Sequence, residues 1–233
     1  MCLEHSERND SEMSLKGKKF VASFSGGKDS TLAIYRAIMN GMIPVEFIIT
    51  YNIDKERSWF HGIPETLLNT IEESVGVPIR LIKTTGAEYE ANFEKALQSA
   101  KERGAEICVF GDIDLDGHLT WCKDRCKAVA IEAFFPLWHE SRKSIVHEFI
   151  DSGFKAAITI VDTNRMPDSF LGKTLSRNVT MDIEKSGADI CGENGEYHTF
   201  VYGGPLFKNE IKFEFGEKVY QDNYGILPVC SVK

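Results

Sequence analysis

Hydrophobic and polar residues follow two different rhythms along the first half of the chain. Short runs of β-branched, aromatic and aliphatic residues are typical of buried parallel strands, whereas apolar residues three or four positions apart predict amphipathic helices. The two kinds of segment alternate: strands are predicted over residues 20–24, 45–51, 79–83 and 107–110, and helices over residues 29–40, 64–75, 88–103 and 120–132. Repeated βα units of this length predict an α/β fold with a doubly wound parallel sheet.

The rhythm changes after Pro136. Beyond it, helices are predicted over residues 141–152 and 173–186, and strands over residues 156–161, 198–202 and 210–220. Residues 211–215 alternate between hydrophobic and charged side chains, as antiparallel strands with one exposed face do. We therefore predict a flexible tail over residues 1–17, an α/β domain over residues 18–135 and a smaller C-terminal α+β domain over residues 136–233.

The strongest chemical signal lies between the first predicted strand and the first predicted helix, where the chain reads Ser25-Gly26-Gly27-Lys28-Asp29-Ser30. Glycines allow the backbone to approach a ligand closely, and consecutive amides at a helix N-terminus attract anions. Lys28 supplies a positive charge, Ser25 and Ser30 supply hydroxyls, and Asp29 either caps the helix or helps to hold Mg²⁺. A plain glycine turn before a capped helix would not require Ser, Lys, Asp and Ser in this register.

This loop is not a Walker A motif, because Ala22 and Asp29 stand where that motif needs Gly and a hydroxyl residue. It resembles the loop of the PP-loop ATP pyrophosphatases. The resemblance implies that ATP is the cofactor, that the loop holds the β- and γ-phosphates as the leaving pyrophosphate, and that a substrate oxygen attacks the α-phosphate. The products would be AMP and pyrophosphate.

A second dense segment, Gly192-Glu193-Asn194-Gly195-Glu196-Tyr197-His198-Thr199, lies in the second half of the chain. Acids, an amide and an imidazole at this spacing can bind an amine or a metal, or move a proton. Charge patterning alone favours the alternative of a solvated acidic turn that opens a hairpin.

Taken together, the PP-loop at 25–30 and the segments at 111–113, 135–138 and 192–207 resemble the diphthine–ammonia ligase family, over nearly the whole chain after the tail. The resemblance implies the fold of the adenine nucleotide alpha hydrolases, an ATP-binding domain over 18–135 and a substrate-binding domain over 136–233. It implies ATP-dependent amidation of a small-molecule or modified-residue acceptor by ammonia or an amine. It implies that Lys28 stabilises the leaving pyrophosphate. Glu193, Glu196 and His198 would act on the acceptor or deprotonate the incoming amine. Asn194, Gly195 and Thr199 would bind the acceptor.

Residues 192–199, the C-terminal signature of the family, depart from the signature of the archaeal and eukaryotic members, which typically reads Glu-Gly-Gly-Glu-Tyr-Glu-Thr. Asn194 replaces a Gly and His198 replaces a Glu. The His form is similar to the bacterial branch of the family, for which the resemblance implies a cobalamin-related acceptor. These two substitutions leave the expected ATP chemistry unchanged. They indicate an acceptor whose charge differs from that of the acceptor that a Glu at position 198 would suit.

Two further positions lie where the crevice of a doubly wound sheet is expected. Asp112 follows the fourth predicted strand and is predicted to orient the nucleotide, its Mg²⁺ or the acceptor. Asp114 and Asp116 continue the pattern of a calcium loop, but Lys123 stands where its Glu is needed, so calcium is rejected. His61 follows the second predicted strand, and a surface position and a role in substrate binding both fit it.

Charge and composition narrow the function. The 233 residues carry a net charge of −8, which argues against a nucleic-acid partner. No apolar run is long enough to span a membrane, and residues 1–19 lack the apolar core of a secretory signal, so we expect a cytoplasmic protein without a membrane partner. Its six cysteines then predict free thiols, and Cys122 and Cys126 lack the second pair of ligands that a metal would need.

Two other functions remain as alternatives. The α/β domain fits an ATP or AMP sensor that turns nothing over, although the loop and the later acids favour an enzyme. A PP-loop protein that thiolates RNA would use a cysteine pair and a basic surface, and the charge is wrong for it. The sequence leaves the acceptor, the amine donor and the oligomeric state open, a homodimer included.

Overall fold

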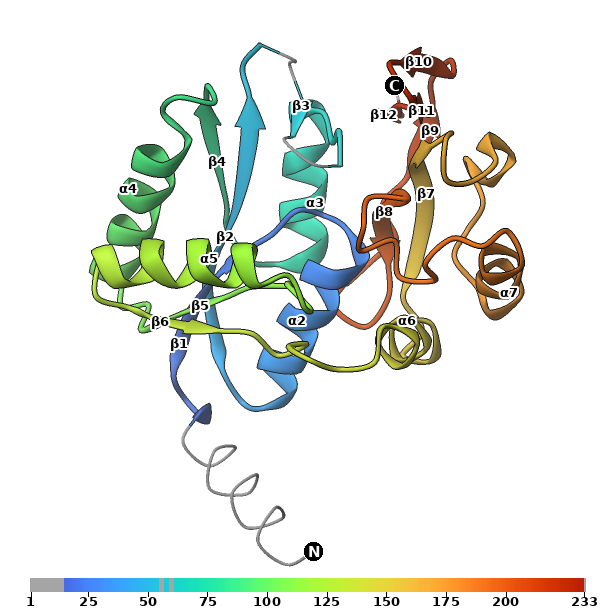
Figure 1. Ribbon diagram of the computed structural model, residues 1–233. Helices are drawn as coiled ribbons and strands as arrows, with labels where there is room; N and C mark the ends of the chain where they lie inside the picture. Colours follow the sequence, from blue (N-terminus) through green and yellow to red (C-terminus); the bar gives the residue numbers. More distant parts are fainter. Residues whose placement is uncertain (1–14, 55–56, 59–60, 233) are drawn as a thin grey trace, which may run out of the picture.

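The computed structural model describes residues 15–54, 57–58 and 61–232. Most of the predicted tail, residues 1–14, lies outside the described residues. The described chain forms a larger part around a parallel sheet and a smaller part around an antiparallel sheet (Figure 1). No helix within the described ranges is long and apolar enough to cross a membrane.

The first sheet has six strands, and five of them are parallel. Their order is β4-β2-β1-β5-β6, and the short strand β3 (Arg57–Ser58) pairs antiparallel with the end of β2. The parallel strands are β1 (Lys19–Ser23), β2 (Ile43–Asn52), β4 (Ile79–Thr84), β5 (Ile107–Val109) and β6 (Glu132–Phe134). The chain runs outward from β1 to one edge and then from β5 to the other, so the strand order reverses between β1 and β5, where such sheets bind ligands.

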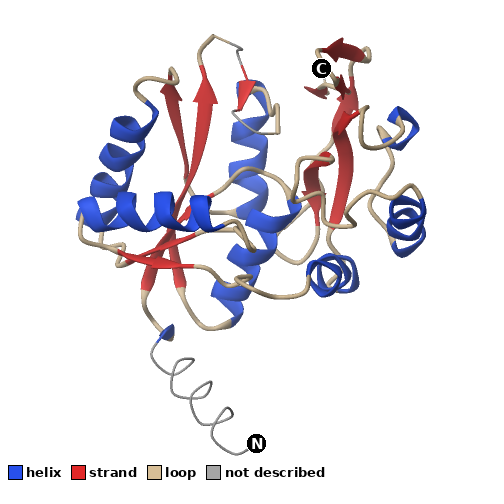
Figure 2. Ribbon diagram, in the orientation of Figure 1, coloured by secondary structure: helices blue, strands red, loops and turns tan. Residues whose placement is uncertain are grey.

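Helices cover both faces of this sheet (Figure 2). Alternate residues of β1 point to opposite faces: Phe20 packs in one hydrophobic cluster with α2 and α3, and Val21 packs in the other with α4 and α5. These helices are α2 (Lys28–Met39), α3 (Leu68–Val75, after the 3₁₀ turn Glu65–Leu67), α4 (Tyr89–Glu102) and α5 (Asp116–Ala128). The predicted doubly wound α/β fold is confirmed.

The smaller part contains a four-stranded antiparallel sheet in the order β10-β11-β7-β8, and a two-stranded pair, β12-β9. Its strands are β7 (Lys155–Asp162), β8 (Tyr197–Gly203), β9 (Phe213–Phe215), β10 (Val219–Gln221), β11 (Tyr224–Ile226) and β12 (Val229–Ser231). Its helices are α6 (Arg142–Asp151), the 3₁₀ turn Asp168–Phe170 and α7 (Arg177–Lys185). The predicted smaller α+β region is therefore present.

The two parts share one hydrophobic core. Leu32 on α2, Val146 on α6 and Val201 on β8 belong to the same buried cluster, and α2 lies between the two sheets (Figure 1). The amide of Val201 also donates to the carbonyl of Gly26, at 2.9 Å. The core thus crosses residue 135, and the division there into two domains stays a prediction.

Three predicted elements were wrong in their extent. The helix predicted over 120–132 is α5, which ends at Ala128; Ala130 then adopts a positive φ of 52°, and the chain enters β6. The helix predicted over 173–186 begins only at Arg177, because Thr174 bridges to Ala157 in β7 and Ser176 caps the helix. The strand predicted over 210–220 is two strands, β9 and β10, which belong to different sheets.

Candidate functional site

The loop from β1 to α2 is packed so tightly that only glycine fits at its centre. Gly26 has a φ of +79°, and a Cβ there would lie 2.1 Å from the Ile63 side chain. A Cβ on Gly27 would lie 2.2 Å from the ring of His61. The loop is therefore held against the connection between β3 and α3.

Hydroxyl groups organise the amides of this loop. The Ser30 hydroxyl accepts a hydrogen bond from the amide of Ser25 at 3.2 Å, and the two serine hydroxyls lie 2.9 Å apart. The amide of Lys28, the first residue of α2, donates to the hydroxyl of Thr199 on β8 at 3.1 Å. The loop and the second sheet are thus joined through the first turn of the helix.

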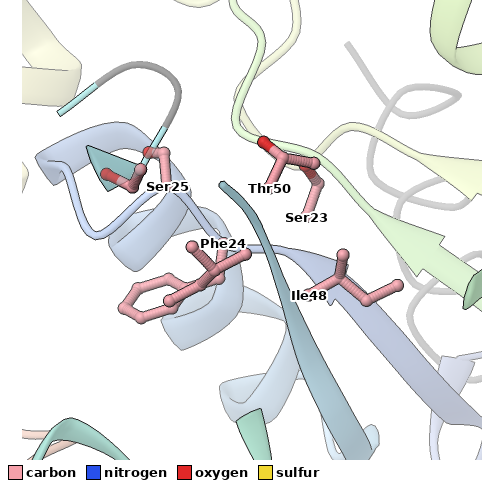
Figure 3. A pocket seen from close by; sticks show the side chains of 7 residues that line it. Ser23, Phe24, Ser25, Ile48 and Thr50 are labelled. Atoms are coloured by element: carbon pink, nitrogen blue, oxygen red, sulfur yellow. The ribbon is translucent and has the colours of Figure 1, made fainter. Parts of the chain in front are cut away.

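A small cavity opens beside this loop at the ends of β1 and β2, lined by Ser23, Ser25 and Thr50 among others (Figure 3).

Lys28 is buried and carries its charge into the site. Only 4% of its surface is exposed, and its Nζ lies 2.8 Å from the Asp29 carboxylate. Burial alone would lower the pKa of the ammonium, but the groups around it, the Asp29 carboxylate first among them, together outweigh burial and raise the pKa of Lys28 well above its ordinary value. The side chain is therefore an ammonium at neutral pH, 5.3 Å from the ring centre of Tyr197.

The PP-loop and the signature segment meet across a single cleft of about 410 Å³. The residues that line it come from the loop, from the end of β5, from the signature and from the connection after β3. They are Ser23, Ser25, Lys28, Asp29, Ser30, His61, Gly111, Asp112, Leu115, His118, Gly192, Glu193, Asn194, Gly195, Tyr197, His198 and Thr199. Segments far apart in the sequence thus bring their acids, imidazoles and the lysine to one place.

Glu193 is a carboxyl that changes ionisation near neutral pH. Burial, followed by the carboxylate of Asp29, raises its pKa to about 7, with Lys28 acting in the opposite direction and Asp112 adding to the rise. A carboxyl with this pKa can exchange a proton with a reactant at physiological pH.

Two of the three imidazoles that line the cleft, those of His61 and His198, are neutral. Burial lowers the pKa of His198 to about 4, with a smaller contribution from Lys28, and lowers that of His61 well below its ordinary value. His61 Nδ1 lies 2.8 Å from the carbonyl oxygen of Thr199, so this nitrogen carries the proton and donates. The centres of the two rings lie 5.1 Å apart, and the rings meet edge to face. His61 therefore lines the cleft, and its role in substrate binding stays a prediction.

Glu196 does not line the cleft, unlike its neighbours in the signature. Its carboxylate accepts hydrogen bonds from the backbone and side-chain nitrogens of Asn194, at 3.1 and 3.2 Å. Glu196 therefore holds the turn that presents Asn194 and Gly195. Its predicted action on the acceptor or the amine stays a prediction.

The sequence reasoning missed His118, whose ring Nδ1 lies 3.2 Å from the Asp112 carboxylate. That carboxylate raises the pKa of His118. The only feature of the sequence that could have indicated His118 is its position near the start of α5, six residues after Asp112. Both residues also border an apolar side pocket of about 240 Å³ that adjoins the cleft and is lined by Ser23, Tyr89, Phe110, Asp112, His118, Trp121 and Cys122.

A magnesium ion in the cleft would take most of its ligands from a bound substrate rather than from the protein. Within the described ranges, no group of three or more His, Cys, Asp and Glu side chains is arranged to hold a metal. Mg²⁺ is commonly bound by one or two carboxylates together with substrate phosphates. The predicted ligand Asp29, at the start of α2, fits that mode. Cys122 and Cys126 are buried thiols, and burial raises the pKa of Cys122.

A glycine loop that follows the first strand, a buried lysine at the helix start and a cleft at the strand-order reversal define an α/β protein of the PP-loop class. Models of the diphthamide synthase N-terminal and C-terminal domains match residues 18–133 and 141–233. The chain therefore belongs to the diphthine–ammonia ligase family, and the resemblance seen in the sequence is confirmed.

Relatives in other organisms agree with this assignment. A diphthine–ammonia ligase of Mus musculus is 34% identical over 243 residues, covering 92% of this chain and 90% of the relative. One of Homo sapiens is 30% identical over 241 residues with the same coverage. A solved structure described as a predicted subunit of a tRNA methyltransferase from Methanocaldococcus jannaschii aligns with a TM-score of 0.43 and 17% identity, covering 83% of this chain and 100% of the other. That score supports no further conclusion.

Proposed function

We propose that this protein is an ATP-dependent ligase that activates the oxygen of a carboxyl or amide group by adenylylation and then joins ammonia or an amine to the activated carbon, which gives an amide when the acceptor is a carboxyl group. One observation carries the proposal: the buried, charged Lys28 faces Glu193 and His198 across one cleft, although they come from distant segments. Family membership supports an ATP-dependent ligase, since the relatives are ligases by name.

In the first step, an oxygen of the acceptor bonds to the α-phosphorus of ATP, and the bond from that phosphorus to the bridging oxygen of the β-phosphate breaks. The pyrophosphate leaves with an additional negative charge. Lys28 stabilises that charge from its buried position at the start of α2. Mg²⁺, when bound with ATP, would neutralise phosphate charge beside Asp29.

In the second step, the nitrogen of ammonia bonds to the activated carbon, and the carbon–oxygen bond to AMP breaks. The nitrogen must lose one proton during this step. Glu193, with a pKa of about 7, is the base that we assign to it. The neutral rings of His61 and His198 offer hydrogen bonds to the acceptor without adding charge to the wall.

Two acceptors fit the proposal. Diphthine is the acceptor that the names of the relatives give. A cobalamin-related small molecule is favoured by the signature, because His198 and Asn194 stand where the diphthine enzymes typically carry Glu and Gly. A neutral imidazole suits an acceptor of different charge than a carboxylate does.

The adenylylation step can be tested before the acceptor is known. Purified protein, Mg·ATP and a small-molecule extract of the source cells are incubated with labelled pyrophosphate and without ammonium. We expect label to enter ATP, because adenylylation reverses when no amine consumes the intermediate. Exchange that appears only after ammonium is added would contradict a separate adenylylation step.

A further inference from the structure

Arg142 joins two carboxylates that belong to different sides of the site. It is the first residue of α6 and is not among the residues that line the cleft. Its Nε and Nη2 each donate to the Asp114 carboxylate at 2.7 Å, and its Nη1 donates to Asp189 at 2.6 Å. A planar guanidinium can make these bonds at once in a fixed geometry, which an ammonium cannot.

Each carboxylate belongs to a loop that carries a cleft residue. Asp114 lies two positions after Asp112, in the loop that follows β5. Asp189 precedes Glu193 and fixes its turn: one oxygen accepts from the amide of Cys191 at 3.0 Å, and the other accepts from the amide of Glu193 at 3.2 Å. The backbone of Glu193 is therefore held by the same carboxylate that Arg142 holds.

We propose that Arg142 is a positioning residue that couples the loop after β5 to the signature loop and, through Asp189, sets the place of Glu193 in the cleft. Its side chain is about one-quarter exposed and that of Asp189 is 14% exposed, so water competes only partly with the contact. Removing the guanidinium frees both loops together, because it is bound to each. The kinetic consequence rests on the proposed function, whereas the consequence for loop order does not.

Arg36 provides a matched control. It also pairs with two carboxylates, those of Glu140 and Glu148, and it also joins α2 in the first part to α6 in the second. It does not line the cleft, and neither do its two partners. A loss of stability common to both arginines can thus be separated from an effect on the signature loop.

Hydrogen exchange on the full chain tests the coupling. Arg142→Gln is expected to speed amide exchange in residues 189–196 about tenfold, the size of coupling usual between contacting residues. Asp189→Asn is expected to act similarly, and the double variant should exchange no faster than the more affected single variant. Arg36→Gln should leave this segment unchanged. Unchanged exchange in Arg142→Gln, or additive effects in the double variant, would overturn the proposal.

The kinetics of AMP formation then separate positioning from general damage. Arg142→Gln is expected to lower kcat on the order of 10²-fold, with little change in the KM for ATP, because a misplaced base slows the reaction more than it weakens nucleotide binding. Arg142→Lys keeps the charge without the fork and should recover only part of the rate. Full recovery by lysine would overturn the geometric role. If the wild-type chain makes no AMP, the proposed function fails, and the exchange result still decides the role of Arg142.

Discussion

Replacing Lys28 by alanine is expected to lower the formation of AMP and pyrophosphate by about 10³-fold, the upper range for removing one preorganised charge donor. The ammonium is buried against Asp29 at the start of α2. Its charge is fixed in place before the pyrophosphate develops, so no rearrangement is required when the bond breaks. Rates are measured as AMP released from Mg·ATP in the presence of ammonium and extract.

Lys101→Ala serves as the matched control for this substitution. Its ammonium also makes one short bond, to the carbonyl of Val129 at 2.7 Å, but it lies at the far end of α4. The control should retain the wild-type rate. Circular dichroism and thermal unfolding check that Lys28→Ala is folded. A folded Lys28→Ala protein that keeps a tenth or more of the wild-type rate would remove Lys28 from the mechanism.

Gly111→Ala is expected to destabilise the protein by about 1–3 kcal/mol and to weaken ATP binding. A Cβ on Gly111 would lie 2.6 Å from the amide nitrogen of Ser30 and 2.8 Å from the carbonyl carbon of Asp29. These are backbone atoms in the first turn of α2, and they cannot rotate away as a flexible side chain would. The loop after β5 and the PP-loop must therefore separate, which displaces Asp112 from Lys28.

Gly117→Ala is the control for Gly111→Ala and should change stability in the opposite direction. Gly117 lies in the first turn of α5, and a Cβ there would meet nothing within 4 Å. Alanine lowers the entropy of the unfolded chain, so a gain of about 0.4–1 kcal/mol is expected. Urea unfolding gives both free energies, and calorimetric titration gives the Kd for Mg·ATP. Equal stability of the two variants would show that the close approach at Gly111 is not required.

The sequence predicted the first sheet well because buried parallel strands and amphipathic helices have different periods. The strand β6 was missed because its three residues, Glu132, Ala133 and Phe134, continue the spacing of the helix before them. The split between β9 and β10 was also missed. An alternating pattern indicates that one face of a strand is buried, but it does not indicate which sheet the strand joins.

The site was predictable where its chemistry is local in the sequence. The PP-loop is one such segment, since its glycines, lysine and serines are adjacent. His118 and Arg142 were missed because their importance comes from what lies opposite them in space, Asp112 for one and Asp189 for the other. Glu196 was predicted to act in the site because it belongs to the signature. Its carboxylate instead accepts a hydrogen bond from Asn194, and the sequence of a loop does not predict which way such a side chain points.

The nucleotide products test the central claim most directly. Purified protein is incubated with Mg·ATP and ammonium, with and without a small-molecule extract of the source cells, and the nucleotides are separated. The attack that we assign to the α-phosphate predicts AMP and pyrophosphate that depend on the extract. Formation of ADP and phosphate would contradict it, whereas ATP that stays intact in every mixture would favour a nucleotide sensor or a protein acceptor that the extract lacks.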